Sequence, residues 1–574
     1  MTDASATPPP PEAPTPEQGS LALARPEDDH TREEWEKAAA AVLRKARRLT
    51  DDDPDAAVWD RLTRTTLDGI GITPLGTPAG SYAGLRPSRT GAWDVRALVS
   101  GPDAKLANEA ALVDLDGGVT SLWVHAAPAD LPTVLDGVLL DLAPVVLSAD
   151  DATAAARAFA ALVAEKAVTP HAETNLGADA LGDAVVELAQ AARDLGVRGV
   201  VVDAVAAHDR GASDVQELGY SLWAGVTALR VLVAAGFSAS EAAATLEFRY
   251  AATDEQFPTI AKLRAARRLW ARVLELSGVE GVAQRQHAVT SRPMLSKYDP
   301  YVNMLRGTVA AFAAGVGGAD AVTVLPFDSA LGLPEAFGRR IARNVNHLLI
   351  DESHVAAVAD PAGGAYAVER LTDDLAAAAW AELQLLEKDG ADAFGERVAA
   401  TVARREAEIA TRKRPLTGLS EFPNLAEALP ERTPDPLNDA VRRYGASYEA
   451  LRDEPAAVPV FLATLGPVAQ HTARATFASN LLAAGGIAVE VAGATTDADD
   501  LAGKYRAAGS PAVACLAGSD TAYAEWGAAA AEALRAAGAT YVIVAGKPAD
   551  YADDNAAMGV DALAFLHRVR EKLA

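Results

Sequence analysis

Between about residues 55 and 412, short hydrophobic runs alternate with long alanine-rich stretches of helical periodicity. Alternation of this kind predicts parallel strands joined by helical crossovers. About 350 residues of it favour an α/β fold with a (β/α)8 TIM-type barrel as the domain spanning residues 55–412. The clearest predicted strands are Val95–Val99, Thr120–Val124, Val145–Leu147 and Val200–Val202, and helical patterns such as Asp179–Leu195 and Ala224–Ala235 lie between such runs.

Residues 458–574 show the most regular pattern, with four strand–helix units in succession. Glycine-marked turns separate the units, and the order predicts a flavodoxin-like doubly wound domain with any ligand at the carboxyl ends of its strands. The predicted strands are Val460–Leu465, Ile487–Val491, Ala512–Leu516 and Tyr541–Val544, and the predicted helices are Val468–Ala484, Ala498–Ala508, Ala522–Ala537 and Val560–Leu573.

The two remaining regions have weaker patterns. Residues 413–457 are rich in Pro, Asn and Gly, which indicates an interdomain linker with some helix near its end. Residues 1–54 begin with a Pro-rich acidic tail, predicted to be disordered over residues 1–29, followed by a helical arm from about Thr31 to Arg48. The arm offers only a few apolar positions, so we expect it to lie against the barrel or a partner chain.

Composition and charge exclude several classes of ligand and site. The chain has 574 residues and a net charge of -26, which argues against binding to nucleic acid or to anionic membranes. A single cysteine, Cys515, excludes an intrachain disulfide and a cysteine metal cluster. The N-terminus lacks the features of a signal peptide, and no apolar run is long enough to span a membrane, so a cytoplasmic protein is expected.

Long motifs in series carry a family resemblance. Ala261–Val273 reads AKLRAARRLWARV, and His287–Asp328 contains a TS…D-x-Y-x-N-x-x-R core. GRRIARNVNHLLIDES (Gly338–Ser353), ADPAGGAYAVERLT (Ala359–Thr372) and PLTGLSEFPNL (Pro415–Leu425) follow in the same order as in the family. From about residue 55 to its end, the chain resembles the cobalamin-dependent acyl-CoA mutases of the methylmalonyl-CoA mutase family.

This resemblance implies a chemistry and a partner. In the family, adenosylcobalamin supplies a radical while the barrel holds the acyl-CoA, and the protein binds, orients and seals the reactants. Some members are heterodimers in which one subunit is catalytic and its homologous partner is not.

The family's cobalt-ligand motif, D-x-H-x-x-G, is replaced in this chain. In the family the His ligates cobalt, the Asp orients the His, and the Gly allows close approach of the cofactor. An ungapped register between Gly466 and Gly485 puts Val468 at the Asp position, Gln470 at the His position and Ala473 at the Gly position. The neighbouring His471 could be a displaced ligand, but Ala469 stands where its orienting Asp would be. A polar residue in the first turn of a surface helix is the favoured interpretation.

Two family barrel residues are also replaced. In GAWDVRALVS, Arg96 fits the family pattern, but Leu98 occupies the position of a functional Tyr. In AVAAHDRGAS, alignment on Gly211 puts Ala206 at the position of a functional His. His208 lies two residues later, where we expect a solvated loop histidine.

Several other polar residues have both a functional and a structural interpretation. His287 matches a family position near the substrate channel, so it is either a residual CoA contact or a hydrogen-bonded loop histidine. Arg264, Arg267 and Arg268 share a helix, where salt bridges or a subunit contact are favoured over a CoA-phosphate site. Cys515 lies in an apolar strand and is interpreted as a core thiol.

The resemblance and the replacements together predict an isomerase subunit without catalytic, cofactor-binding or metal residues of its own. Its expected partner is a homologous catalytic large subunit that holds adenosylcobalamin and interconverts methylmalonyl-CoA and succinyl-CoA. Binding of acyl-CoA by this chain is doubtful. Two alternatives remain open: an autonomous cobalamin-dependent mutase that uses His471, and an acyl-CoA-binding or regulatory module without a reaction.

Overall fold

The computed structural model describes residues 29–78, 89 and 91–574. The predicted disordered tail therefore lies outside the described residues, apart from Asp29. The described chain divides into two compact units. One comprises residues up to Thr65 together with Gly71–Leu75, and the other comprises Thr66–Ile70 and everything from Gly76 to the C-terminus.

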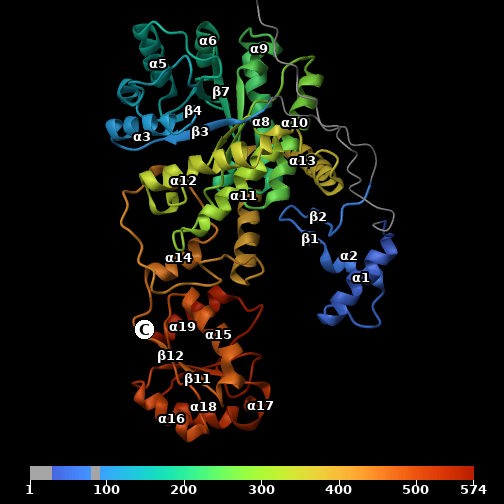
Figure 1. Ribbon diagram of the computed structural model, residues 1–574, viewed down its shortest axis with the longest axis vertical. Helices are drawn as coiled ribbons and strands as arrows, with labels where there is room; N and C mark the ends of the chain where they lie inside the picture. Colours follow the sequence, from blue (N-terminus) through green and yellow to red (C-terminus); the bar gives the residue numbers. More distant parts are fainter. Residues whose placement is uncertain (1–28, 79–88, 90) are drawn as a thin grey trace, which may run out of the picture. The chain divides into compact units, whose positions relative to one another are not determined.

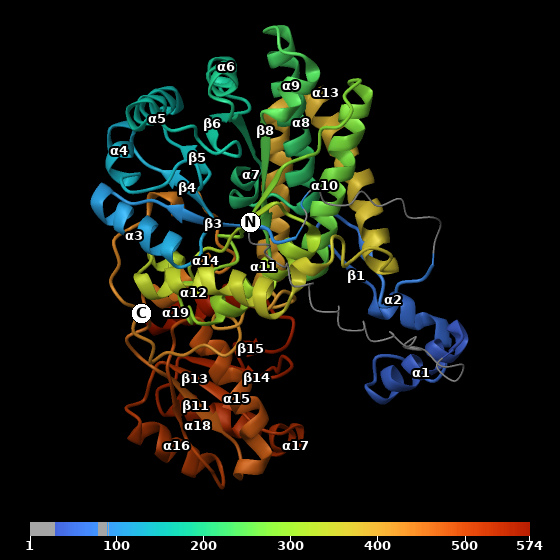
Figure 2. The same ribbon diagram turned by 45° about the horizontal axis from the view of Figure 1, so that its top comes forward.

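The larger unit contains a closed barrel of eight parallel strands, as the sequence predicted (Figures 1 and 2). The strands follow chain order around the barrel, and β10 pairs with both β9 and β3 to close it. They are β3 (Asp94–Val99), β4 (Ser121–His125), β5 (Val145–Ser148), β6 (Asn175–Asp179), β7 (Arg198–Asp203), β8 (Leu246–Ala252), β9 (Gln286–Thr290) and β10 (Ala321–Thr323).

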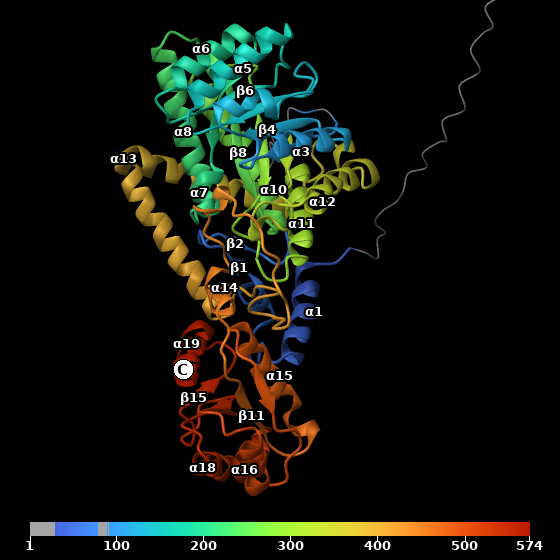
Figure 3. The same cartoon turned by 90° about the vertical axis from the view of Figure 1, so that its left-hand side faces the viewer.

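Helices follow most of these strands, and α13 is the longest of them. Gly390 in α13 has φ 80° and breaks the helical conformation, so two helical segments meet at an angle (Figure 3). The helices are α3 (Ala104–Asp116), α4 (Leu131–Val134), α5 (Ala152–Lys166), α6 (Val185–Leu195), α7 (Val205–Asp209), α8 (Asp214–Ala234), α9 (Ala239–Ala244), α10 (Gln256–Leu276), α11 (Val302–Gly317), α12 (Ala336–His347), α13 (Tyr366–Ala410) and α14 (Ala446–Asp453).

Strand β8 shows how the sequence divides the barrel wall into two faces. Every residue of LEFRYAA is buried. Phe248 faces outward, where its ring lies 4.7 Å from that of Trp270 on α10. Glu247 and Arg249 therefore face inward, because successive side chains of a strand point to opposite faces. The barrel interior is polar at this strand, while the layer under the helices is apolar.

The C-terminal part forms a five-stranded parallel sheet in the order β12-β11-β13-β14-β15, which confirms the predicted doubly wound fold. Hydrophobic clusters cover both faces of this sheet. The strands are β11 (Val460–Thr464), β12 (Val489–Val491), β13 (Val513–Ala517), β14 (Tyr541–Ala545) and β15 (Asp554–Ala556). The helices are α15 (Val468–Ala484), α16 (Ala498–Ala507), α17 (Asp520–Ala522), α18 (Ala528–Ala536) and α19 (Ala562–Leu573).

The smaller N-terminal unit has a hydrophobic core of its own, contrary to the expectation that the arm buries little. Trp35 and Trp59 lie 4.7 Å apart, and Ala40, Leu43 and Val58 are buried beside them. This unit contains α1 (Arg32–Lys45), α2 (Val58–Leu62), β1 (Arg64–Thr65) and β2 (Gly71–Ile72).

Two predicted helices of the barrel differ in their bounds from those observed. The helix predicted over Asp179–Leu195 begins only at Val185, since Asn175–Asp179 forms strand β6. The helix predicted over Ala224–Ala235 is the second half of α8, which begins at Asp214 with Ser213 as its N-cap. Among the described residues, no helix is both long and apolar enough to cross a membrane.

Candidate functional site

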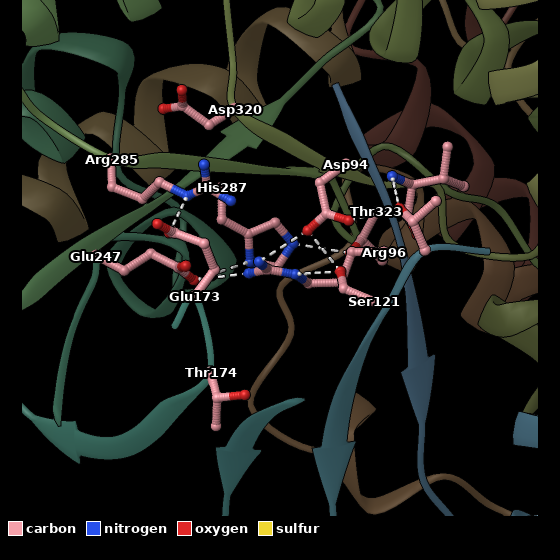
Figure 4. Close-up of polar contacts among 12 residues, drawn as sticks. Asp94, Arg96, Ser121, Glu173, Thr174, Glu247, Arg285, His287, Asp320 and Thr323 are labelled. Carbon is pink, nitrogen blue, oxygen red and sulfur yellow. Dashed lines mark hydrogen bonds and ion pairs between the residues drawn. The ribbon is translucent and has the colours of Figure 1, made fainter. Parts of the chain in front are cut away.

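Arg96 on β3 reaches across the interior of the barrel (Figure 4). Its guanidinium donates to Glu247 at 2.7 Å, to Ser121 at 3.0 Å and to Asp94 at 3.1 Å. Burial alone would lower the pKa of Arg96, but the Glu247 and Asp94 carboxylates outweigh it and raise the pKa. Because β3 and β8 are not neighbours in the barrel, the Arg96–Glu247 ion pair spans its interior.

His287 lies on β9 inside the barrel and is fully buried, which rules out the loop histidine, one of the two alternatives left open by the sequence. Its Nε2 lies 2.8 Å from the Thr323 hydroxyl, and its Nδ1 accepts from Arg249 Nε at 3.2 Å. Burial and the nearby Arg96 and Arg249 guanidiniums hold the pKa of His287 well below its usual range. The imidazole is therefore neutral, with both nitrogens occupied by protein groups.

Trp123 on β4 lies over this network toward the carboxyl end of the barrel. Its ring contacts His287 edge-on at 5.7 Å, and the Arg249 guanidinium lies 4.0 Å above the ring. Arg249 also pairs with Asp203 at 2.7 Å, which fixes the guanidinium over the indole. Trp123, Arg249 and His287 are all buried, so protein side chains occupy the barrel axis at this level.

The two replaced barrel positions lie near this interior but contribute no polar group. Leu98 on β3 is paired in register with Trp123 and is half-buried beside it. Ala206 lies on the short helix α7 and is exposed. Neither methyl nor isobutyl side chains can transfer a proton or donate a hydrogen bond.

His208 on α7 is buried, which corrects the expectation of a solvated loop histidine. Its Nε2 lies 2.7 Å from the Ser291 hydroxyl, and its Nδ1 lies 3.6 Å from Glu217. Burial, with a contribution from Lys262, holds its pKa well below the usual range. His208 therefore belongs to a buried polar network in which Lys262 donates to Glu217 at 2.6 Å.

The cobalt-ligand positions lie at the start of α15, after strand β11. Val468, Gln470 and Ala473 are exposed there. A Cβ atom added to Gly466 would lie 2.5 Å from the Gln470 side-chain oxygen, so this side chain folds back over the preceding turn. His471 is in the first turn, as predicted, but is only 5% exposed and its Nδ1 lies 3.2 Å from the Gly466 carbonyl. His471 therefore lies on the buried side of a helix whose other face is exposed, as a surface helix was expected to be.

Tyr523 and Arg474 join the turns that follow β13 and β14. The Tyr523 hydroxyl accepts from the Gly518 amide at 3.1 Å and contacts the Ala545 carbonyl at 2.8 Å. Arg474 donates to the Gly518 carbonyl at 2.6 Å, and its guanidinium lies 4.8 Å from the Tyr523 ring centre. These two side chains thus cover the turns after β13 and β14, at the edge where a doubly wound sheet ordinarily binds its ligand.

The remaining candidates have structural partners. Arg264 forms ion pairs with Asp360 and, at 2.6 Å, with Glu369, while Arg268 pairs with Asp373. Arg267 is buried and donates to the Gln286 side chain and the Gly317 carbonyl. Cys515 is buried in β13, where burial raises its pKa to about 12, as expected of a core thiol.

A cavity of 460 Å³ opens at the carboxyl ends of β3, β4 and β5, where barrel enzymes place their active sites. It is bounded by the loops after these strands and by residues 434–437. Its ionisable lining residues are His125, Asp130, Asp150, Asp151 and Asp435, with no Lys or Arg among the lining residues. In the part of the chain that the structure describes, no cluster of three or more His, Cys, Asp or Glu residues is arranged to hold a metal ion.

Glu247, Arg249 and Trp123 form the interior network but were not among the residues predicted from the sequence. A signal was present, since Glu247 and Arg249 alternate with aromatic residues in a short run that reads as a buried strand. Polar residues two apart in such a run indicate the inner face of a barrel. Tyr523 and Arg474 gave no comparable signal, because they come from separate helices.

Comparison with known proteins agrees with this architecture. The family model described as methylmalonyl-CoA mutase matches residues 184–498. The methylmalonyl-CoA mutase small subunit of Streptomyces virginiae is 46% identical over 96% of this chain and 98% of its own length. The corresponding small subunit of Propionibacterium freudenreichii subsp. shermanii is 39% identical over 94% of this chain and 92% of its own length.

A further relative is the probable methylmalonyl-CoA mutase small subunit of Mycobacterium tuberculosis strain H37Rv, which is 41% identical over 90% of this chain and 92% of its own length. These matches extend over both the barrel and the C-terminal sheet, in agreement with the motifs found in the sequence. From the serial motifs, the two folds and these matches, we conclude that the chain belongs to the methylmalonyl-CoA mutase family.

Proposed function

We propose that this chain is the non-catalytic small subunit of an adenosylcobalamin-dependent methylmalonyl-CoA mutase. It assembles with a homologous catalytic large subunit and stabilises it, and the complex interconverts methylmalonyl-CoA and succinyl-CoA. Adenosylcobalamin is bound by the partner. In this proposal the small subunit contributes no catalytic, cofactor-binding or metal-binding residue.

The observation that carries the proposal is the occupied barrel axis. A barrel that holds an acyl-CoA along its axis needs an open interior, but Arg96 and Glu247 bridge this interior at 2.7 Å. Above them, Trp123 and Arg249 form a second buried layer. Opening the axis would separate a buried ion pair, which costs about 3–5 kcal/mol when one charge loses its partner.

The residues of the C-terminal domain do not fit a cobalamin. An amide, as at Gln470, is a poor cobalt ligand, and Val468 cannot orient an imidazole. His471, the ligand required by an autonomous mutase, is buried with one nitrogen directed to the Gly466 carbonyl. Tyr523 and Arg474 fill the turns after the third and fourth strands, so the sheet edge offers little room to a large planar group.

No feature of the described residues favours the alternative of an acyl-CoA-binding module. The 460 Å³ cavity at the barrel's carboxyl end is lined by several Asp residues and by no Lys or Arg. CoA carries phosphate groups, and a net charge of -26 on the chain opposes their approach. Titration calorimetry of the isolated chain with methylmalonyl-CoA is expected to give no saturable heat.

Cofactor stoichiometry tests the proposal directly. Both subunits are co-expressed, the complex is purified in adenosylcobalamin, and bound cofactor is counted against each chain by absorbance and quantitative mass spectrometry. One cobalamin per two chains is expected, with none retained by the small subunit alone. Two cobalamins per heterodimer, or a stable and fully active large subunit without this chain, would refute the proposal.

A further inference from the structure

Phe422, in the linker loop of residues 416–427, combines a strained backbone with an exposed ring. Its φ is +55°, a left-handed conformation that is a genuine outlier for a bulky side chain. Pro423 follows it and further disfavours helical backbone conformations at Phe422. The residue is nevertheless 72% exposed, so packing within this chain does little to offset the strain.

Three arginines hold this loop in place, two of them through its backbone carbonyls. Arg306 from α11 donates to the Thr417 carbonyl at 3.0 Å. Arg452 from α14 donates to the Gly418 carbonyl at 2.8 Å and to the Asn424 carbonyl at 2.7 Å. Arg412 pairs with Glu421, the residue next to Phe422, at 2.6 Å. The surrounding structure therefore imposes the conformation of Phe422.

Other large apolar side chains are exposed on the elements that hold this loop. The Asp299 amide, at the turn before α11, donates to Glu427 of the loop at 2.8 Å. Tyr301 and Leu305, on the first turns of α11, are 65% and 69% exposed. Leu425 of the loop is 42% exposed. We refer to Tyr301, Leu305, Phe422 and Leu425 as the Phe422 surface.

The charges around the Phe422 surface indicate which kind of protein chain binds there. Glu421 and Glu427 are both paired with arginines, so the surface carries no free carboxylate from its own loop. Interface cores are depleted of charge and enriched in aromatic residues in the same way. Two copies of a chain with net charge -26 repel each other, so a different protein chain is favoured over a second copy.

We propose that the Phe422 surface is the docking site for the catalytic large subunit, with Phe422 as the anchor that enters an apolar pocket of that partner. This inference rests on the proposed function and specifies where the two chains meet. A rigid loop loses little conformational entropy on binding, and a prepositioned aromatic ring is a typical interface hot spot. The strain at Phe422 is then tolerated because the ring is buried only in the complex.

The test uses two substitutions whose effects on the free chain and on the complex differ. Phe422→Gly removes the ring and relieves the left-handed strain, whereas Phe422→Ala removes the ring alone. For both, the Kd of the full-length chain for the large subunit is expected to rise at least about tenfold, measured by surface plasmon resonance. The Tm of the isolated Phe422→Gly chain is expected to stay unchanged or to rise.

Phe257→Ala serves as the matched control, because Phe257 on α10 is 56% exposed without left-handed strain. Its Kd is expected to stay within twofold of that of the unmodified chain. If the unmodified chain binds the large subunit and the Phe422 variants bind equally well, this inference is overturned and the proposed function stays intact. Unmodified chain that fails to bind would overturn both. A Phe422-dependent homodimer, seen by light scattering, would overturn the assigned occupant.

Discussion

Arg96 and Glu247 form a 2.7 Å ion pair between strands that are not neighbours in the barrel, and neither side chain has any exposed surface. Removing one partner leaves a buried charge, so Glu247→Leu is expected to destabilise the barrel by about 3–5 kcal/mol in urea denaturation. The double variant Arg96→Met/Glu247→Leu should recover much of this loss. A double variant no more stable than Glu247→Leu would contradict a coupled pair.

Asp209 is expected to make stability depend on pH. Burial raises the pKa of Asp209 to about 6, only partly offset by Arg292 at 3.4 Å. The stabilisation from this raised pKa is present below the unfolded-state value near 3.8 and is lost as the pH rises through 6. Between pH 4 and pH 7 the folded state should lose about 2 kcal/mol from this group.

The measurement compares denaturation of the unmodified chain and Asp209→Asn across this pH range. The amide does not titrate, so the difference in stability between the two proteins should shift in favour of the variant as the pH rises. Parallel curves for the two proteins would show that Asp209 titrates as an ordinary carboxyl group.

Tyr523→Phe removes a hydroxyl that accepts from the Gly518 amide and contacts the Ala545 carbonyl. Since these groups lose a partner, the C-terminal domain should lose about 1–2 kcal/mol. Hydrogen exchange of the Gly518 amide, followed by mass spectrometry, should accelerate accordingly. Tyr541→Phe is the control, because its hydroxyl contacts the Asp554 side chain at 3.0 Å and does not reach these turns. Unchanged hydrogen exchange at the Gly518 amide would show that the Tyr523 hydroxyl does not hold the turns after β13 and β14 together.

Trp59→Ala should disrupt the N-terminal unit selectively. The indole packs against Trp35 at 4.7 Å, and its N–H donates to Glu36 at 2.6 Å. Truncation of this half-buried ring is expected to destabilise the unit by about 2–3 kcal/mol. Limited proteolysis should then cleave within residues 29–65 faster while the barrel stays resistant. Equal cleavage of the two regions would mean that the unit does not fold on its own core.

Periodicity predicted the regular elements well and the irregular ones poorly. The helix Val468–Ala484 has the predicted bounds, because a proline precedes it and two glycines follow it. Strand β15 was missed, since Asp554–Ala556 is three residues long, polar and at the sheet edge. A strand of this kind has neither a hydrophobic run nor an alternating pattern.

The candidate site was predicted less completely than the fold. Motif spacing identified the positions at which family residues are replaced. It did not identify the side chains that fill the barrel interior and the turns of the C-terminal sheet. His208 was expected in a solvated loop because its sequence neighbours are polar, and a loop position was one of the two interpretations left open for His287. Their burial depends on contacts with Ser291 and Thr323 on distant strands, which no local pattern records.

The filled barrel axis has a consequence for how the protein keeps its shape. An enzyme that closes around a metabolite gains stability from that metabolite by mass action, so its melting temperature varies with supply. In this chain the groups on the axis are its own side chains, Arg96, Glu247 and His287, present at fixed stoichiometry. Its barrel should therefore melt at the same temperature whether a cell is starved of or saturated with acyl-CoA.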